Sequence, residues 1–208
     1  MGDEFERAAA LLAGLEGDWR AREEALRKLQ GRLAEGRPDA FEFANHRGAK
    51  LLALQLSDLR SGIVKAAADA VRAACTAKTA GKSLSLTGFA EGLLREPALF
   101  KGVGSAHKLI SGYAVSALTA LFECGAVPPT ALEGFFTAWR AHKNPQIREA
   151  VARCFAVCAA RPHRSAELDE LLRRAADFFM RDALAAVRAQ AKRIRIVDSA
   201  PAAPPSDN

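Results

Sequence analysis

Cysteine and histidine are the residues of this sequence that could hold a metal ion or act as a nucleophile. The cysteines all lie in apolar stretches of helical period, and the histidines are scattered singly. Cys154 and Cys158 would share one helix face, but no second Cys or His pair accompanies them at the spacing of a zinc site. We therefore predict cysteines buried in the core and no metal site. These residues are Cys75, Cys124, Cys154, Cys158, His46, His107, His142 and His163.

A glycine-containing stretch at 102–108, Gly-Val-Gly-Ser-Ala-His-Lys, is the segment most similar to a phosphate-binding loop. It lacks a glycine directly before the lysine and follows no predicted strand, so we expect a turn between helices. The sequence shows no paired acid and base and no Ser/His/Asp arrangement. These observations predict a protein that is not an enzyme and needs no cofactor.

A third kind of chemistry, protein recognition, is indicated by Lys and Arg near the turns between helices, with Trp19 beside Asp18 in the first turn. Loops on a rigid scaffold often carry binding residues, and a tryptophan among positive charges is typical of an interface anchor. The alternative is that Trp19 packs into the terminal repeat and the charges are solvated helix ends. The turns are expected at 17–20, 57–61, 104–108, 142–145 and 181–182.

Helices must position these turns, because apolar residues recur at three- and four-residue steps almost throughout the chain. Glycine and proline separate the periodic segments, and Asp18 and Asn144 are suitable N-caps for the helices that follow them. Residues 197–208 have no periodicity and are predicted to form a disordered tail after a single domain over 1–196. Ten helices are expected, at about 3–15, 18–35, 40–57, 59–78, 84–97, 106–123, 128–142, 145–160, 165–180 and 182–195.

The predicted helices form pairs, and the second helix of each pair begins alike. Aligning Ala21-Arg22, Val64-Lys65, Ile110-Ser111, Ile147-Arg148 and Val187-Arg188 gives spacings of 43, 46, 37 and 40 residues. HEAT and armadillo repeats have a period of about 40–47 residues. A helical hairpin cannot bury its apolar face alone, so such hairpins stack on one another. The predicted fold is an all-α HEAT-repeat α-solenoid of about five helical hairpins.

Charge and composition limit the functional classes. The chain has 208 residues, with 30 Lys and Arg against 24 Asp and Glu, a net charge of +6. No apolar run approaches the roughly 18 residues that a membrane span needs, and the acidic N-terminus is unlike a signal peptide. We therefore expect a cytoplasmic protein with no membrane partner. A calculated pI near 9.4 leaves nucleic-acid binding open as an alternative.

Three segments together resemble the TOG domains of the CLASP and Crescerin group. They are Asp-Trp-Arg-Ala-Arg at 18–22, Asp-Leu-Arg-Ser at 58–61 and Lys-Asn-Pro-Gln-Ile-Arg at 143–148. Their order and spacing match the family from about Phe5 to Arg195. TOG domains are HEAT-repeat arrays that bind the αβ-tubulin heterodimer through the turns inside their repeats.

The resemblance implies a tubulin-binding role that can be assigned residue by residue. It implies αβ-tubulin or microtubules as partners, other cytoskeletal proteins as further candidates, and a cytoskeletal location whose assignment to spindle or cilium stays open. The physical argument agrees, because tubulin is acidic and residues 140–195 carry 13 Lys and Arg against 6 Asp and Glu. The matching positions are Trp19, Arg60, Ser61, Lys108, Lys143, Asn144, Arg148 and Arg181.

The chain departs from the family pattern in its number of repeats. Family members usually have six HEAT repeats, and five are recognisable in this sequence. Two alternatives to tubulin binding therefore stay open: a protein scaffold that keeps the fold without binding tubulin, and a basic solenoid that binds nucleic acid. Trp139, the other tryptophan, has few acidic neighbours in sequence and is expected to cap the core of the fourth pair.

Overall fold

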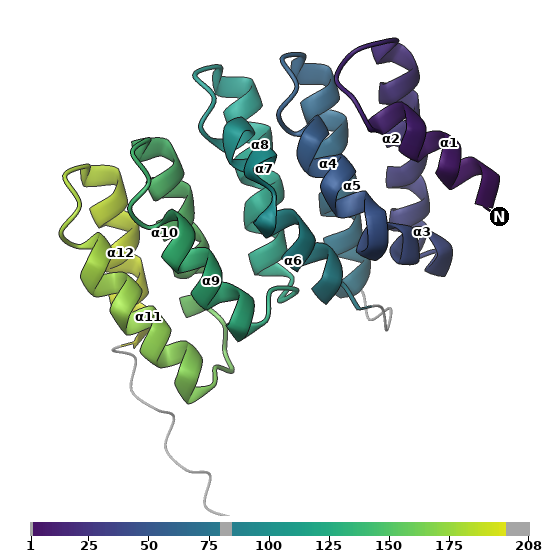
Figure 1. The fold of residues 1–208 in the computed structure, drawn as a ribbon. Helices are drawn as coiled ribbons and strands as arrows, with labels where there is room; N and C mark the ends of the chain where they lie inside the picture. Colours follow the sequence, from purple (N-terminus) through teal and green to yellow (C-terminus); the bar gives the residue numbers. More distant parts are fainter. Residues whose placement is uncertain (1, 80–84, 199–208) are drawn as a thin grey trace, which may run out of the picture. The chain divides into compact units, whose positions relative to one another are not determined.

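The computed structural model describes residues 2–79 and 85–198, and these residues form helices and turns without any strand. The predicted all-α repeat of helical hairpins is confirmed (Figure 1). The elements are α1 (Gly2–Leu12), α2 (Trp19–Glu35), α3 (Pro38–Phe43), η1 (Ala44–Gly48), α4 (Ala49–Gln55), α5 (Ser61–Thr79), α6 (Thr87–Arg95), α7 (Pro97–Val103), α8 (Lys108–Glu123), α9 (Pro129–Trp139), α10 (Pro145–Ala159), α11 (Ala166–Phe179) and α12 (Ala185–Asp198).

Two predicted helices differ from the observed ones. The segment expected as one helix at 40–57 contains a π-helical turn, η1, where the Asn45 side chain bonds both to its own helix and to distant residues. Its Nδ2 donates to the Ser85 and Phe41 carbonyls at 2.9 and 3.0 Å, and its Oδ1 accepts from the Phe89 N–H at 2.8 Å. The helix expected at 84–97 ends at Arg95, and α7 starts at Pro97, which has no N–H to continue α6.

The chain divides into two compact units, Met1–Ala138 and Trp139–Asn208, which we call unit 1 and unit 2. In unit 1, α2 packs against α5 and α5 against α8, so the second helices of three hairpins lie side by side (Figure 1). In unit 2, α10, α11 and α12 all pack against one another. The predicted tail from 197 onward begins inside α12, and residues 199–208 lie outside the described residues.

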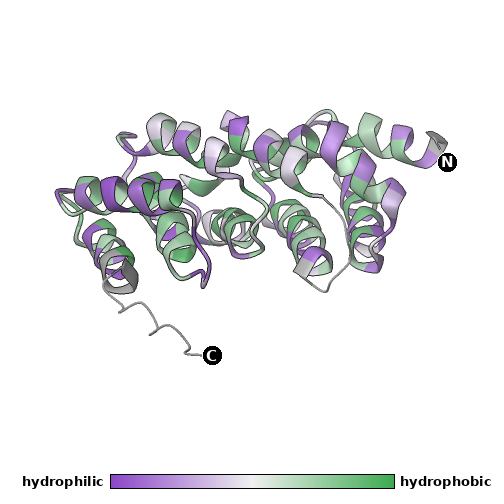
Figure 2. Cartoon of the chain, turned by 90° about the horizontal axis from the view of Figure 1, so that it is seen from below, coloured by the Kyte–Doolittle hydropathy of each residue, from purple (hydrophilic) through white to green (hydrophobic). Residues whose placement is uncertain are grey.

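The core of each unit is built from leucine, alanine and phenylalanine on the inner faces of amphipathic helices (Figure 2). Phe89, Phe100 and Phe122 are fully buried in unit 1, and Phe155 and Phe179 in unit 2. Small alanines between these rings allow the helices to approach closely.

The cysteine prediction is confirmed for three of the four thiols. Cys75, Cys154 and Cys158 are buried, while Cys124 is half-buried.

Gly102 in α7 lies close to the backbone at the end of α4. A Cβ atom at this position would lie 2.2 Å from the Leu56 carbonyl oxygen, which belongs to the backbone and cannot rotate away. We expect Gly102→Ala to destabilise the protein by about 1–3 kcal/mol, since the backbone must shift to admit the methyl group. Urea unfolding followed by circular dichroism measures this loss.

Gly112→Ala is the matched control, because Gly112 is exposed in α8 and a Cβ there meets nothing within 4 Å. The helix propensity of alanine should make that variant more stable by about 0.5–1 kcal/mol. Equal stability changes in the two variants would contradict the close packing of α7 on the end of α4.

Candidate functional site: the intra-repeat turns

In the described part of the chain, five turns connect the two helices of a hairpin, and they share one hydrogen-bond pattern. In each turn a side-chain oxygen accepts the N–H of the residue two positions later. This bond fixes the turn and supplies a partner for an N–H near the start of the second helix. The accepting residues are Asp18, Asp58, Ser105, Asn144 and Asp182. The predicted N-caps Asp18 and Asn144 are confirmed.

The fourth residue of each second helix forms a second shared contact. Arg22, Ser111, Arg148 and Arg188 each donate to a carbonyl of the preceding turn or helix end, at 2.7–3.2 Å. The equivalent residue of the second hairpin is Val64, which has no donor. The repeat alignment made from sequence is therefore one residue too late at Val64-Lys65 and correct at the other four positions.

Two arginines also connect one turn to the next. In unit 1, Arg22 Nη1 donates to Asp58 Oδ2 and to Gln55 Oε1, both at 2.7 Å, and these side chains are almost fully buried. In unit 2, Arg148 binds Asp182 through two bonds, Nε to Oδ2 at 2.6 Å and Nη2 to Oδ1 at 3.0 Å. The same type of ion pair thus joins neighbouring turns within each unit.

We call the exposed residues of these turns and of the adjoining helix starts the turn surfaces. The turn surface of unit 1 comprises residues 15–20, 57–62 and 104–109, and that of unit 2 comprises 140–146 and 181–185. Figure 1 shows the three turns of unit 1 at the same end of their helices. The ion pairs described above place the first two turns of unit 1 next to each other, and likewise the two turns of unit 2.

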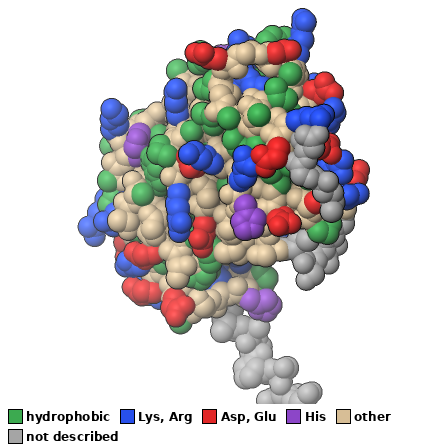
Figure 3. Space-filling view, turned by 45° about the vertical axis from the view of Figure 1, so that its right-hand side comes forward, with side chains coloured by type: hydrophobic (Ala, Val, Ile, Leu, Met, Phe, Trp, Pro, Cys, Tyr) green, Lys and Arg blue, Asp and Glu red, His purple; other side chains and the backbone are tan. Residues whose placement is uncertain are grey.

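Large apolar side chains are exposed mainly on the turn surfaces. Of the six large hydrophobic side chains that are exposed among the described residues, four lie there. The exposed fractions are 40% for Trp19, 87% for Leu59, 55% for Leu109 and 36% for Leu184. Elsewhere, the face of the molecule in Figure 3 shows Lys and Arg side chains interspersed with Asp and Glu.

A basic residue stands next to three of these four apolar side chains. Arg20 stacks on the Trp19 ring with its guanidinium carbon 5.2 Å from the ring centroid, Arg60 follows Leu59, and Lys108 precedes Leu109. The helix N-termini add partial positive charge at the same place. The acidic residues Asp58 and Asp182 are turned inward and paired. Each turn surface therefore offers apolar and cationic groups to a partner.

The structure places the predicted site residues in two different roles. Trp19, Arg60, Lys108, Lys143 and Arg181 are exposed on the turn surfaces, and Ser61 is half-buried at the start of α5. Asn144 caps α10, and the Arg148 guanidinium is engaged by Asp182 and by the His142 and Lys143 carbonyls. Asn144 and Arg148 thus act on the shape of their turn.

Sequence reasoning missed Leu59, Leu109 and Leu184 as exposed apolar residues. A signal was present in the sequence, since each leucine falls within four residues after the turn residue that accepts the hydrogen bond. This pattern can be used for prediction only when the turn residues that accept these hydrogen bonds are already known.

The described residues offer little for metal or nucleophile chemistry. No group of three or more His, Cys, Asp or Glu among them could hold a metal ion, and no helix in the described ranges is long and apolar enough to cross a membrane. A hydrogen bond with Cys124, together with burial, raises the pKa of the Cys75 thiol, and burial raises the pKa of Cys158 to about 11. These two thiols stay protonated at neutral pH and are poor nucleophiles.

Comparison with known proteins gives one family and several similar folds. The chain matches the family described as CLASP N terminal over residues 1–203. A structure described as "Structural Basis of Tubulin Recruitment and Assembly by Microtubule Polymerases with Tumor Overexpressed Gene (TOG) Domain Arrays" is 16% identical with a TM-score of 0.63. An engineered protein is 20% identical with a TM-score of 0.52. No curated protein matches the chain significantly.

The two structural matches differ in coverage. The alignment with the TOG array covers 93% of this chain but 39% of the other, whereas the alignment with the engineered protein covers 94% and 79%. At these identities the likeness shows the fold alone.

The buried pair of Arg22 and Asp58 should dominate the stability of unit 1. Arg22→Met removes the buried cation of Asp58 and leaves that carboxylate only the longer, 3.6 Å contact with the exposed Arg60, so we expect a loss of about 3–5 kcal/mol. Arg22→Met combined with Asp58→Asn should recover part of this loss, because no uncompensated charge remains. Arg27→Met on the solvent side of α2 is the control and should change stability little. A double-mutant cycle by urea unfolding measures these values, and additive losses would contradict the coupling.

The Arg148–Asp182 ion pair should make the free energy of unfolding depend on pH in the acidic range. The hydrogen bond from Arg148 lowers the pKa of Asp182 below its ordinary value. A lowered pKa gives stability that is fully present above the unfolded-state pKa of about 4 and is lost as the pH falls through the folded-state pKa. Asp182→Asn should therefore be less stable than wild type at pH 7 and lose less stability on acidification.

Urea unfolding at a series of pH values from neutral to strongly acidic tests this dependence. Glu167→Gln, at an exposed position in the first turn of α11, is the control and should follow the wild-type curve. Wild-type and Asp182→Asn curves that run parallel would refute the role of the ion pair.

Proposed function

The chain belongs to the CLASP N-terminal family, and on that premise we propose that its turn surfaces bind αβ-tubulin, free or in microtubules, without catalysis. The family and the fold are those of HEAT-repeat binding domains related to tubulin. The observation that carries the proposal is the exposure of Trp19 and Leu59 beside Arg20 and Arg60 on neighbouring turns. The expected consequence is regulation of microtubule dynamics or organisation at the cytoskeleton.

In this proposal the apolar side chains provide the anchors. Trp19 and Leu59 extend from turns that the Arg22–Asp58 pair holds together, so little side-chain or loop order must be gained on binding. A tryptophan removes a large apolar area from water with few rotatable bonds, which makes it effective at an interface.

The cations provide orientation and speed of encounter. Arg60 and Lys108 in unit 1, and Lys143 and Arg181 in unit 2, face solvent and can pair with acidic groups of tubulin. Ser61 lies beside Arg60 and can add a hydrogen bond. Asn144 and Arg148 contribute indirectly, since they fix the backbone that carries Lys143.

Trp19→Ala should weaken tubulin binding about thirtyfold or more, as expected for an interface hot spot. Co-elution with αβ-tubulin in size exclusion and pelleting with stabilised microtubules measure the loss and show which form of tubulin is bound. Lys50→Ala removes an exposed side chain at the start of α4, away from the turns, and should bind as wild type. Failure of the wild-type chain to bind either form, even at low salt, would refute the proposal and leave a protein scaffold.

Reversing the charge of Arg60 or Lys143 should slow association and reduce its sensitivity to salt, because exposed charges act through screened long-range attraction. Stopped-flow or interferometry at low and physiological salt measures the association rate. Arg95→Glu on α6 has the same charge change away from the turns and serves as the control. Equal slowing by all three reversals would indicate a general effect of net charge. Binding of DNA or RNA that tolerates Trp19→Ala would instead favour the nucleic-acid alternative.

A further inference from the structure

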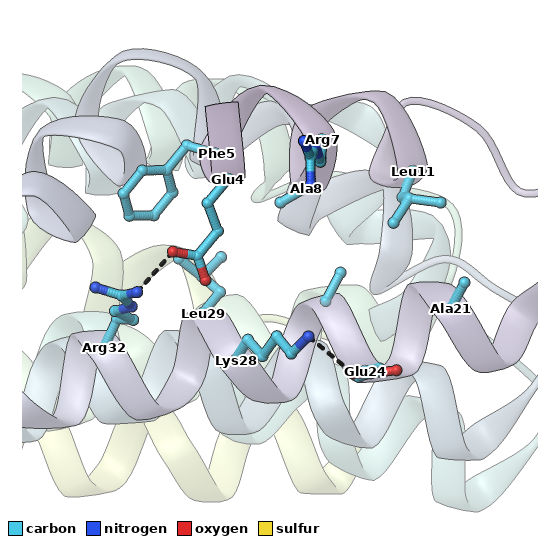
Figure 4. Close-up of a pocket in the computed structure, with 11 residues that line it drawn as sticks. Glu4, Phe5, Arg7, Ala8, Leu11, Ala21, Glu24, Lys28, Leu29 and Arg32 are labelled. Atoms are coloured by element: carbon cyan, nitrogen blue, oxygen red, sulfur yellow. Dashed lines mark hydrogen bonds and ion pairs between the residues drawn. The ribbon is translucent and has the colours of Figure 1, made fainter. Parts of the chain in front are cut away.

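A groove of about 440 Å³ lies between α1 and α2 in the first hairpin (Figure 4). The opposite side of α2 packs against α5, so the groove is on the face of α2 that the second hairpin leaves uncovered. Its floor is apolar, and Leu11 at one end is 42% exposed. The apolar residues that line it are Phe5, Ala8, Leu11, Ala21, Ala25 and Leu29.

Among the described residues, only side chains of α1 and α2 line this groove, so its apolar floor is open to a further helix. Ala25 is buried in the floor of the groove, and Ala21 at its edge is half-buried. Gly31, one helical turn beyond Lys28 on α2, is exposed, and a Cβ there would meet nothing within 4 Å.

The charged residues at the groove indicate what kind of partner can bind there. Glu4 pairs with Arg32 at 2.6 Å, and Glu24 pairs with Lys28 at 2.8 Å, and with Arg7 these are the charged residues that line the groove (Figure 4). A partner of a single charge sign would meet both attraction and repulsion here. A surface with alternating signs complements itself when it is turned by a two-fold axis, which is the geometry of an isologous dimer.

We propose that a second copy of this chain docks on the α1–α2 face, with the two α2 helices antiparallel. When the two helices cross midway between Glu24 and Lys28, Glu24 of each copy lies opposite Lys28 of the other. The existing pair within each helix then becomes two pairs between helices, and Ala21 faces the region of Gly31 on the other copy. Leu11 and the apolar floor are covered in the same contact.

The size of this face sets the expected affinity. With 17 residues, α2 is about 25 Å long, and two adjacent helices are about 20 Å wide, so each copy can bury on the order of 500 Å². The total is at the lower end of specific interfaces, where association is weak and reversible. The dimer is thus a micromolar or weaker complex that forms when the chain is locally concentrated. It would display two sets of turns, and linked sites gain avidity.

Sedimentation equilibrium of the full chain over a series from low micromolar to near-millimolar concentration tests the proposal without any tubulin. We expect the wild-type mass to rise from monomer toward dimer. In the Lys28→Glu variant, Glu24 of each copy would lie opposite a glutamate of the other copy, and this repulsion should weaken the dimer several-fold. The double variant with Glu24→Lys and Lys28→Glu restores opposite charges and should recover wild-type association.

Two further variants test whether the chain associates through this face or through another surface. Leu11→Glu puts a charge at the apolar floor and should abolish association, while Lys50→Glu, the same charge reversal as Lys28→Glu at an exposed site on α4, should leave it unchanged. Circular dichroism confirms that each variant is folded. A monomer at all concentrations would overturn the proposal, as would a dimer indifferent to Lys28→Glu and Leu11→Glu, or a charge-swapped variant as weak as the single reversal.

Discussion

The ion pair between an arginine at the start of one second helix and an aspartate in the next turn is the interaction on which the turn surfaces depend. Arg22 is 1% exposed, and Asp58, Gln55 and the Leu15 carbonyl receive its hydrogen bonds. A buried charge is tolerated only where such partners exist. The contact therefore fixes how the first two turns lie relative to each other. It thereby also fixes the relative positions of Trp19 and Leu59, which these turns carry on their exposed side.

The same interaction explains the sign of the exposed charge. Asp58 and Asp182 are at the turns, yet each is directed at an arginine inside the structure. With these carboxylates paired internally, the exposed charged groups at the described turns are the cations Arg20, Arg60, Lys108, Lys143 and Arg181 and, in the first turn, the carboxylates of Glu16 and Asp18. The network that stabilises the fold thus also leaves an excess of exposed positive charge at the turns.

The sequence allowed the helices and turns to be predicted where local rules decide them. Helical period located the hairpins, and the capping residues Asp18 and Asn144 marked two helix starts because an N-cap acts on its immediate neighbours. The π-helical turn at Ala44–Gly48 was missed because it depends on bonds from Asn45 to residues forty positions away. The same limit applies to Arg148, which matched a family contact position while its actual partner, Asp182, is a distant residue.

The solvent exposure of individual side chains was the other property that the local sequence pattern did not predict. Leu59 follows an aspartate and precedes an arginine, a context equally compatible with a leucine that folds back onto α5. It stays in solvent because Asp58 is drawn inward by Arg22 and bonds the Arg60 N–H, which directs the intervening residue outward. An apolar side chain held in water by a buried ion pair has its geometry already set before a partner arrives. Binding then costs little conformational entropy, and the free energy of removing Leu59 and Trp19 from water is available to the complex.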